Sequence, residues 1–313
     1  MGSLILQQTI NALTVGSIYA LIALGYTMVY GVLRLINFAH SELFTSGAFI
    51  GLFLAGVLGI TGHPAAGLIV GLLTFVIIGL AGVTLEIVAY RPLRGTVRLA
   101  PMLSALGMAV VIQNTVMLLA GRRPLIYPSF LPSGVIDLFG AIVTYKQITI
   151  FLVAVLLMVG LELFVNRTNL GVRVRAVAES VETASLVGIN PNTAISLIFF
   201  IGPGLGAVAG ILYSSFYGVA TFTMGFVIGL KAFTAAILGG IGSIPGAVLG
   251  GFLLGIIETF GTAWLPVLTG GLIGTEYRDI FAFSVLVLIL LFRPAGLLGE
   301  HVSEETRVYK SDF

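Results

Sequence analysis

The chain has 313 residues, of which 58% are hydrophobic and only 9% are charged, and its mean hydropathy is +1.12. A soluble domain of this length needs a charged surface to cover its core, so this composition excludes water as the main solvent and indicates an integral membrane protein. The net charge is +2 without a long basic run, which argues against nucleic acid as a partner, and the absence of cysteine excludes disulfides and thiolate metal sites.

Apolar segments follow one another along the chain, each near the length of about 20 residues that a bilayer crossing needs. They are expected near 8–33, 38–60, 64–90, 99–120, 147–165, 193–217, 226–241, 245–268 and 279–293. Glycines blur the ends of 38–60 and 226–241, so these two segments are candidates for broken or re-entrant helices. The predicted fold class is therefore an all-α polytopic membrane protein with eight to ten transmembrane or half-membrane helices.

The basic residues of the connections divide unequally between the two sides of the membrane. With the N-terminus outside, the cytoplasmic side receives Arg34, Arg91, Arg94, Arg98, Arg167, Arg173, Arg175, Arg293, Arg307 and Lys310. The outside then receives Arg122, Arg123, Lys146 and Arg278. Because Lys and Arg are retained on the cytoplasmic side, we expect the N-terminus outside and the C-terminus inside.

The first of two long connections, 121–146, lies outside the cell in this topology. Its residues Pro124, Pro128 and Pro132 favour extended or turn geometry. We expect a short amphipathic piece at 135–139 to lie on the membrane surface.

The second long connection, 166–192, lies in the cytoplasm and carries helix signals. Ser180 is a suitable N-cap, Glu182 follows in the first turn, Gly188 suits a left-handed end, and Pro191 prevents continuation. These signals predict a helix of about two turns. Its apolar residues available for packing are Val181, Ala184, Leu186 and Val187. An ordinary surface helix is the alternative interpretation.

The stretch from Glu182 to Gly188 resembles the EAA loop of ABC importer permeases. In that loop Glu, Ala, Ala and, four residues later, Gly form the helix that docks into the ATPase subunit, and here Thr183 replaces the first Ala. The resemblance implies an ATPase-coupling helix that comprises Ser180, Glu182, Ala184, Leu186, Gly188 and Asn190.

Longer stretches, from about residue 11 to residue 299, resemble the LivH family of branched-chain amino acid permeases. They are the first span with its INFAH turn (16–40), the coupling loop (175–190), the Gly-rich helix pair (238–251) and the final span with RPAGLLG (277–299). Ser41 stands where the family usually has Gly after the His, so the turn departs from the family pattern there.

The resemblance implies a single transmembrane permease domain over 1–313 with a type II-like ABC importer fold, in the cytoplasmic (inner) membrane of a prokaryote. The partners it implies are a second, LivM-like permease, two cytoplasmic ABC ATPase subunits and an extracytoplasmic substrate-binding protein. The substrate would be a branched-chain, hydrophobic amino acid. The chain lacks a G-x-x-x-x-G-K-[ST] loop, so ATP must be bound by another subunit, and we expect neither a cofactor nor catalysis here.

Two other functions stay open at this point. Related permeases resemble one another, so an importer of urea or short amides is the nearest alternative, and an ATP-independent carrier or channel is an alternative of another class. An intramembrane enzyme is disfavoured, because His40, His63 and His301 are dispersed and form no H-E-x-x-H motif.

Ionisable groups at membrane depth are costly and are therefore functional candidates. Asn37, His40 and Glu42 lie at the start of the second segment, and Lys231 and Glu258 lie in separate late segments. We assign these residues to the translocation path, with local hydrogen bonding or a Lys231–Glu258 pair as the structural alternative. Near their predicted cytoplasmic ends, Glu86 and Glu162 are expected to snorkel to the interface without a transport role.

Glycines recur every four residues through the segment 193–217, at Gly202, Gly206 and Gly210. This spacing favours close helix packing, with a hinge as the alternative. Similar small and aromatic residues in the first 60 positions and in Leu212–Leu254 also suggest an internal repeat. An odd number of crossings between the copies would make it an inverted repeat.

Overall fold

The computed structural model of the chain describes residues 2–59, 64–97, 99–272 and 274–299. Seven of its helices are long and apolar enough to cross a membrane: α1 (Gly2–Leu33), α2 (His40–Leu58), α3 (Pro64–Leu85), α4 (Leu99–Ala120), α5 (Tyr145–Arg167), α8 (Pro191–Tyr217) and α10 (Ile244–Leu268). Two shorter helices, α9 (Met224–Gly239) and α11 (Arg278–Phe292), match the remaining predicted segments. The mostly helical, polytopic membrane fold is therefore confirmed. His63, Arg98, His301, Arg307 and Lys310 lie outside the described residues.

The centre of the bundle is built from α1 and α8, most of whose residues are buried, whereas few residues of α4 are buried. Small residues allow this close packing. A methyl group added at Gly251 of α10 would lie 2.5 Å from the Ala20 backbone of α1, and one added at Gly82 of α3 would meet the backbone of α8. In lipid, such backbone approach supplies the packing that apolar burial supplies in water.

The helices α2 and α9 both begin inside the bundle. The first residue of α2, His40, places its Nε2 3.2 Å from the Ile22 carbonyl oxygen in the middle of α1. The connection after α1 therefore folds back by about 16 Å, the rise of the 11 residues that follow Ile22. At the start of α9, Gly225 lies against Ser41 and Thr45 of α2. The first turns of these two helices thus meet in the protein interior.

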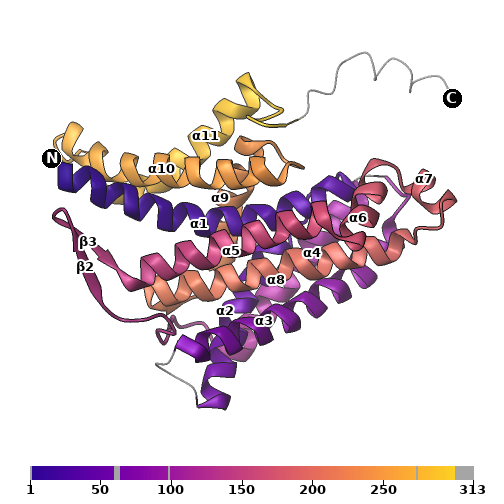
Figure 1. The fold of residues 1–313 in the computed structure, drawn as a ribbon, viewed down its shortest axis with the longest axis horizontal. Helices are drawn as coiled ribbons and strands as arrows, with labels where there is room; N and C mark the ends of the chain where they lie inside the picture. The colour runs from indigo at the N-terminus through magenta and orange to yellow at the C-terminus, as the bar shows by residue number, and fades with distance from the viewer. Residues whose placement is uncertain (1, 60–63, 98, 273, 300–313) are drawn as a thin grey trace.

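The helices α1 to α4 and α8 to α11 form two copies of one arrangement. Within it, α1 packs on α9 and α10 as α8 packs on α2 and α3, and α2 contacts α4 as α9 contacts α11. The copies run in opposite directions, because α1 begins at the N-terminal end of the bundle and α8 begins directly after α7 at the opposite end (Figure 1). We call this arrangement the inverted repeat. Its copies are longer than the stretches that the sequence suggested, which were the first 60 residues and Leu212–Leu254.

The connection 121–146 is not helical in its second half, and the expected amphipathic piece at 135–139 is extended. The strands β2 (Val135–Leu138) and β3 (Ala141–Thr144) form an antiparallel hairpin in which Val135 pairs with Thr144. Its two turn residues, Phe139 and Gly140, both have positive φ, as tight hairpin turns require. Earlier in the connection, β1 (Leu125–Ile126) pairs with β4 (Val219–Ala220) after α8.

The connection 166–192 contains two helices, α6 (Asn169–Glu179) and α7 (Val181–Leu186). They lie at the end of the bundle opposite the N-terminus and the β2–β3 hairpin (Figure 1). At the same end, α3 continues into the π-helical turn η1 (Glu86–Tyr90) and the 3-10 turn η2 (Arg91–Leu93). A further 3-10 turn, η3 (Thr275–Tyr277), precedes α11.

The glycine stripe of α8 faces α1 and α2. A methyl group added at Gly210 would lie 2.3 Å from the Phe44 carbonyl oxygen, and one at Gly206 would lie 3.2 Å from the His40 ring. Gly202 faces the backbone of Gly25. This close contact favours helix packing over a hinge, since a hinge needs free space around the glycines.

We predict that Gly210→Ala lowers the thermal unfolding temperature of the purified protein. The added methyl has no room beside the Phe44 backbone, and such overpacking costs about 1–3 kcal/mol. Gly160→Ala in α5 is the matched control, because nothing lies within 4 Å of a methyl there. Equal unfolding temperatures for the two variants would contradict the close packing of α8 on α2.

Candidate functional site

The helix predicted between Ser180 and Gly188 is α7, and it has the predicted capping residues at both ends. The Ser180 Oγ accepts a hydrogen bond of 3.2 Å from the Thr183 amide, and Gly188 adopts a left-handed φ of 82° after the helix. The Asn190 side chain then caps α8 by accepting a bond of 3.0 Å from the Asn192 amide. Local capping residues therefore hold α7 as a separate short helix directly before α8.

One side of α7 faces the protein and the other projects from it. Ala184 is buried, and its carbonyl oxygen accepts a 3.0 Å bond from the Ile189 amide. Leu186 and Val187 are exposed for 88% and 70% of their surface, and Glu182 is exposed as well. Exposed apolar side chains on a projecting helix suit the binding of another protein.

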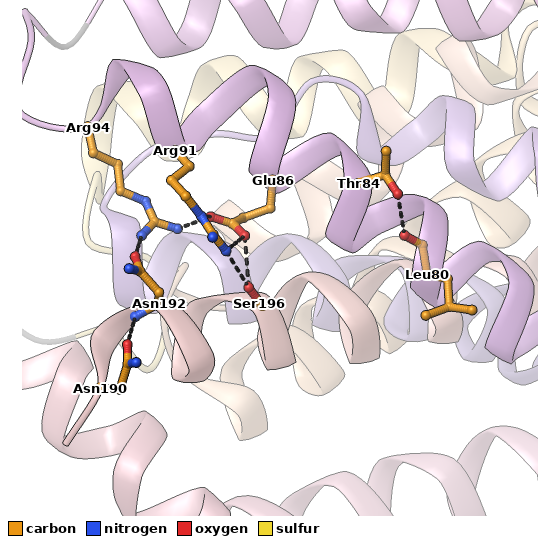
Figure 2. A network of polar contacts seen from close by, with 8 residues as sticks. All are labelled: Leu80, Thr84, Glu86, Arg91, Arg94, Asn190, Asn192 and Ser196. Carbon is orange, nitrogen blue, oxygen red and sulfur yellow. Dashed lines mark hydrogen bonds and ion pairs between the residues drawn. The ribbon is translucent and has the colours of Figure 1, made fainter.

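A cluster of charged and polar residues lies beside α7, where η1 and η2 meet the first turns of α8 (Figure 2). The Glu86 carboxylate is fully buried, and it accepts bonds from Arg91 Nη2 at 2.7 Å, from Ser196 Oγ at 2.8 Å and from Arg94 Nη2. Arg94 also donates from Nη1 to Asn192 Oδ1 at 2.7 Å. We call these five residues the Glu86 cluster.

The expectation that Glu86 snorkels to the interface is wrong. Its carboxylate points inward and is neutralised by two arginines from its own segment, which a buried charge requires. Burial lowers the pKa of the Arg94 guanidinium and Glu86 raises it, with a net shift downward that leaves an arginine protonated. By contrast Glu162 is half-buried in the last turns of α5 and accepts a 2.6 Å bond from Asn166.

The predicted path residues at the start of α2 have different surroundings. Asn37 Oδ1 accepts bonds from the Tyr90 hydroxyl at 3.0 Å and from the Ala39 amide at 3.1 Å. The His40 ring bonds to the Ile22 carbonyl and meets the Tyr26 ring edge-on at 4.7 Å. Both residues therefore hold the first turn of α2 in place.

Glu42 differs from its two neighbours. It is 3% exposed, and its Oε2 has no hydrogen-bond partner among the described residues. A buried carboxyl oxygen without a partner is rare in folded proteins. Glu42 therefore offers a hydrogen-bond acceptor that none of the described residues uses.

The second predicted pair, Lys231 and Glu258, is brought together as expected. Lys231 of α9 is fully buried, and its Nζ lies 2.7 Å from Glu258 Oε1 of α10 and 2.6 Å from Asp279 Oδ1 of α11. The Tyr19 hydroxyl of α1 donates to Glu258 Oε2 at 2.8 Å, and Arg278 Nε lies 3.8 Å from Glu258 Oε1. We call these residues the Lys231 cluster.

The Lys231 cluster has two cations and two anions, and one of its sides is open. Lys231 and Glu258 are buried, whereas the side chains of Arg278 and Asp279 are each 41% exposed. Sequence reasoning missed Tyr19, Arg278 and Asp279. The adjacent opposite charges of Arg278 and Asp279 at the start of the last segment were the available signal for two of them.

A groove of about 550 Å³ opens between α5 and α10. Its lining is apolar apart from Glu162 and includes Met158, Val248 and Phe252. A site for a zwitterion needs partners for both charges, so this groove does not suit an amino acid.

Comparison with known proteins shows a resemblance over most of the chain. A family model described as "Branched-chain amino acid transport system / permease component" matches residues 8–290. The high-affinity branched-chain amino acid transport system permease protein BraD of Pseudomonas aeruginosa is 47% identical over 94% of this chain and 95% of its own length. The corresponding LivH protein of Salmonella typhimurium is 44% identical over the same shares. No solved structure matches the chain.

A more distant relative is the probable branched-chain amino acid transport permease protein LivH of Methanocaldococcus jannaschii. It is 25% identical over 92% of this chain and 91% of its own length. The likeness therefore extends over nearly full-length chains even at low identity.

We predict that Lys231→Met strongly destabilises the protein, because it leaves buried Glu258 without its nearest cation. Breaking a buried ion pair costs about 3–5 kcal/mol. The double variant Lys231→Met/Glu258→Gln should regain thermal stability, since neither buried charge remains.

Thermal unfolding in detergent measures both effects, with Arg122→Met as the control at an exposed arginine. A double variant no more stable than Lys231→Met alone would show that the two residues do not act as a pair.

Proposed function

The chain belongs to the family of branched-chain amino acid transport system permease components, and on that premise we propose that it carries branched-chain amino acids across the membrane in an ATP-driven importer. A permease component is an integral membrane protein and not itself an enzyme. In such a system ATP is bound by separate ATPase subunits, which work with a second permease and a binding protein. For this chain we propose a LivM-like second permease, two ATPases and an extracytoplasmic binding protein.

The observation that carries this proposal is the projecting helix α7 with its exposed Leu186 and Val187. We assign to α7 the role of docking into an ATPase subunit, so that closure of the ATPases on ATP pushes this end of the permease. The position of α7 supports it: the helix is capped at both ends and leads directly into α8, which crosses the bundle. A push on α7 therefore reaches the centre of the protein.

The proposed orientation places the α7 end in the cytoplasm and the N-terminus outside. Basic residues at the α7 end include Arg91, Arg94, Arg167, Arg173 and Arg175. Positive charge is retained on the cytoplasmic side, which supports this orientation. In it, 166–192 is the cytoplasmic coupling connection, and 121–146 with its hairpin is the extracytoplasmic connection.

An amino acid zwitterion carries two charges that hydrocarbon cannot accommodate without partners. The Lys231 cluster supplies charges of both signs, and its exposed members, Arg278 and Asp279, belong to the open side of the cluster. We therefore assign Lys231 and Glu258 to the translocation path, together with Glu42, whose Oε2 has no hydrogen-bond partner among the described residues. Asn37 and His40 support it by holding the start of α2, and selection among substrates is assigned to the binding protein.

We predict that Leu186→Asp releases the ATPase subunits from the complex. The residue is 88% exposed, so the substitution leaves the fold intact but places a charge in the docking surface. Loss of a central apolar contact typically weakens binding by about 2 kcal/mol or more. Co-purification of the ATPases with the tagged permease measures the loss.

Phe139→Asp is the matched control, because Phe139 is 89% exposed at the opposite end of the bundle. It should leave the ATPases attached. Retained ATP-dependent uptake after deletion of 181–186 would end the coupling role of α7, whereas uptake that needs no ATP would favour an ATP-independent carrier or channel.

We predict that proteoliposomes with the complete complex and its binding protein take up labelled leucine only when ATP is present inside. Unlabelled isoleucine and valine should compete, because the proposed substrate class shares their apolar side chains, whereas urea and acetamide should not. Competition by urea at the same concentrations would instead support the permease for urea or short amides.

A further inference from the structure

The Glu86 cluster joins the first turns of α8, which begins directly after α7, to the end of α3. Asn190 ends the connection after α7 and caps α8, and two residues later the Asn192 side chain accepts the Arg94 Nη1 donor at 2.7 Å (Figure 2). Arg94 belongs to the turn after α3 and holds Glu86 with its other nitrogen. A movement of α7 therefore meets this set of contacts before it reaches any other part of α3.

Glu86 fixes the end of α3 to the first turns of α8. Its buried carboxylate accepts a 2.8 Å bond from Ser196, and Arg91 donates to both Glu86 and Ser196. Charge-assisted bonds to a buried carboxylate are strong, and losing one partner leaves an unpaired charge. These contacts therefore favour movement of the end of α3 and the start of α8 as one body.

The segment from Glu86 to Tyr90 is a π-helical turn, a wide turn found frequently at functional positions in helices. Its last residue, Tyr90, is buried and packs on Phe199 of α8 with ring centroids 5.0 Å apart. The Tyr90 hydroxyl donates to Asn37 Oδ1 at 3.0 Å, across 53 residues of sequence. The π turn thus carries the Glu86 cluster at one end and a contact to the α1–α2 connection at the other.

Asn37 in turn organises the first residues of α2. Its side-chain oxygen accepts the Ala39 amide at 3.1 Å and its carbonyl oxygen accepts the His40 amide at 3.1 Å. His40 then reaches the Ile22 carbonyl in the middle of α1. A continuous series of contacts therefore leads from the start of α8, directly after α7, to the first turn of α2 inside the bundle.

We propose that Glu86, Ser196 and Tyr90 are positioning residues that relay the movement of α7, through the π turn and Asn37, to helix α2. This relay rests on the proposed function, because α7 must first be the part that the ATPases move. If these bonds only fixed the end of α3 to the start of α8, their loss would lower the stability of the protein and leave transport unchanged. The relay also affects how much substrate is moved for each ATP.

The test uses substitutions that remove one bond and little packing. Tyr90→Phe deletes the hydroxyl that reaches Asn37 and keeps the ring on Phe199, and Ser196→Ala deletes the bond to Glu86. Thr84→Val is the matched control on α3, because its hydroxyl donates at 3.0 Å to Leu80 of the same helix (Figure 2). The complete complex in proteoliposomes gives leucine uptake and ATP hydrolysis, and their ratio is the first readout.

The second readout is amide hydrogen exchange in 181–186 and in 36–42, compared between the nucleotide-free complex and the complex trapped with ATP and vanadate. The relay predicts that both segments respond in the unmodified complex. In Tyr90→Phe and Ser196→Ala the response of 181–186 should remain and that of 36–42 should be lost. Uptake per ATP should fall by roughly fivefold or more, the lower end of couplings between distant sites. Thr84→Val should change neither quantity.

Two outcomes overturn the relay, and they are distinguishable from one another. If Tyr90→Phe and Ser196→Ala both keep the response of 36–42 and the uptake per ATP, the relay is wrong and α7 keeps its coupling role. If 181–186 does not respond to trapped ATP in the unmodified complex, the coupling role itself fails and the relay fails with it.

Discussion

The fold depends on the pairing of charges that lipid and apolar helices surround. Lys231 is fully buried and is tolerated because Glu258 and Asp279 place their carboxylates within 2.7 Å. Glu86 is buried in the same way and is tolerated because two arginines and Ser196 reach it. Each cluster also holds one partner from a distant helix, Tyr19 at Glu258 and Ser196 at Glu86, so the buried charges connect helices far apart in sequence.

Small residues determine how closely those neighbours approach. The Lys231 cluster needs α1, α9, α10 and α11 together, and Gly251 and Gly255 of α10 bring its backbone against α1. The Glu86 cluster needs α3 beside α8, where Gly79 and Gly82 make the corresponding approach. The two contacts are equivalent in the inverted repeat, and each repeat carries a charge cluster beside its close helix pair.

How much of the structure could be predicted from the sequence depends on how far apart in the chain the interacting residues lie. Lipid imposes a minimum length on every crossing, so the nine segments could be placed within a few residues of the observed helices. Caps such as Ser180 and Asn190 were predictable because their partners lie two or three residues away. Glu86 was misjudged because Ser196, one of its partners, is 110 residues distant, and its position near a helix end suggested exposure. The β2–β3 hairpin was missed because all four residues of β2 are exposed, so the strand has no buried face to mark it.

The meeting of α2 and α9 in the interior joins the two halves mechanically. Ser41 of α2 leaves no room for a Cβ at Gly225 or Gly229 of α9, so the contact there is close to the backbone on both sides. A packed interior of this kind does not compress, and displacement of the start of α2 must therefore displace α9 or separate it from α2. Lys231 lies two residues beyond Gly229 on α9. A movement that enters at α7 and reaches α2 is thus delivered to the helix that carries the buried lysine of the proposed path.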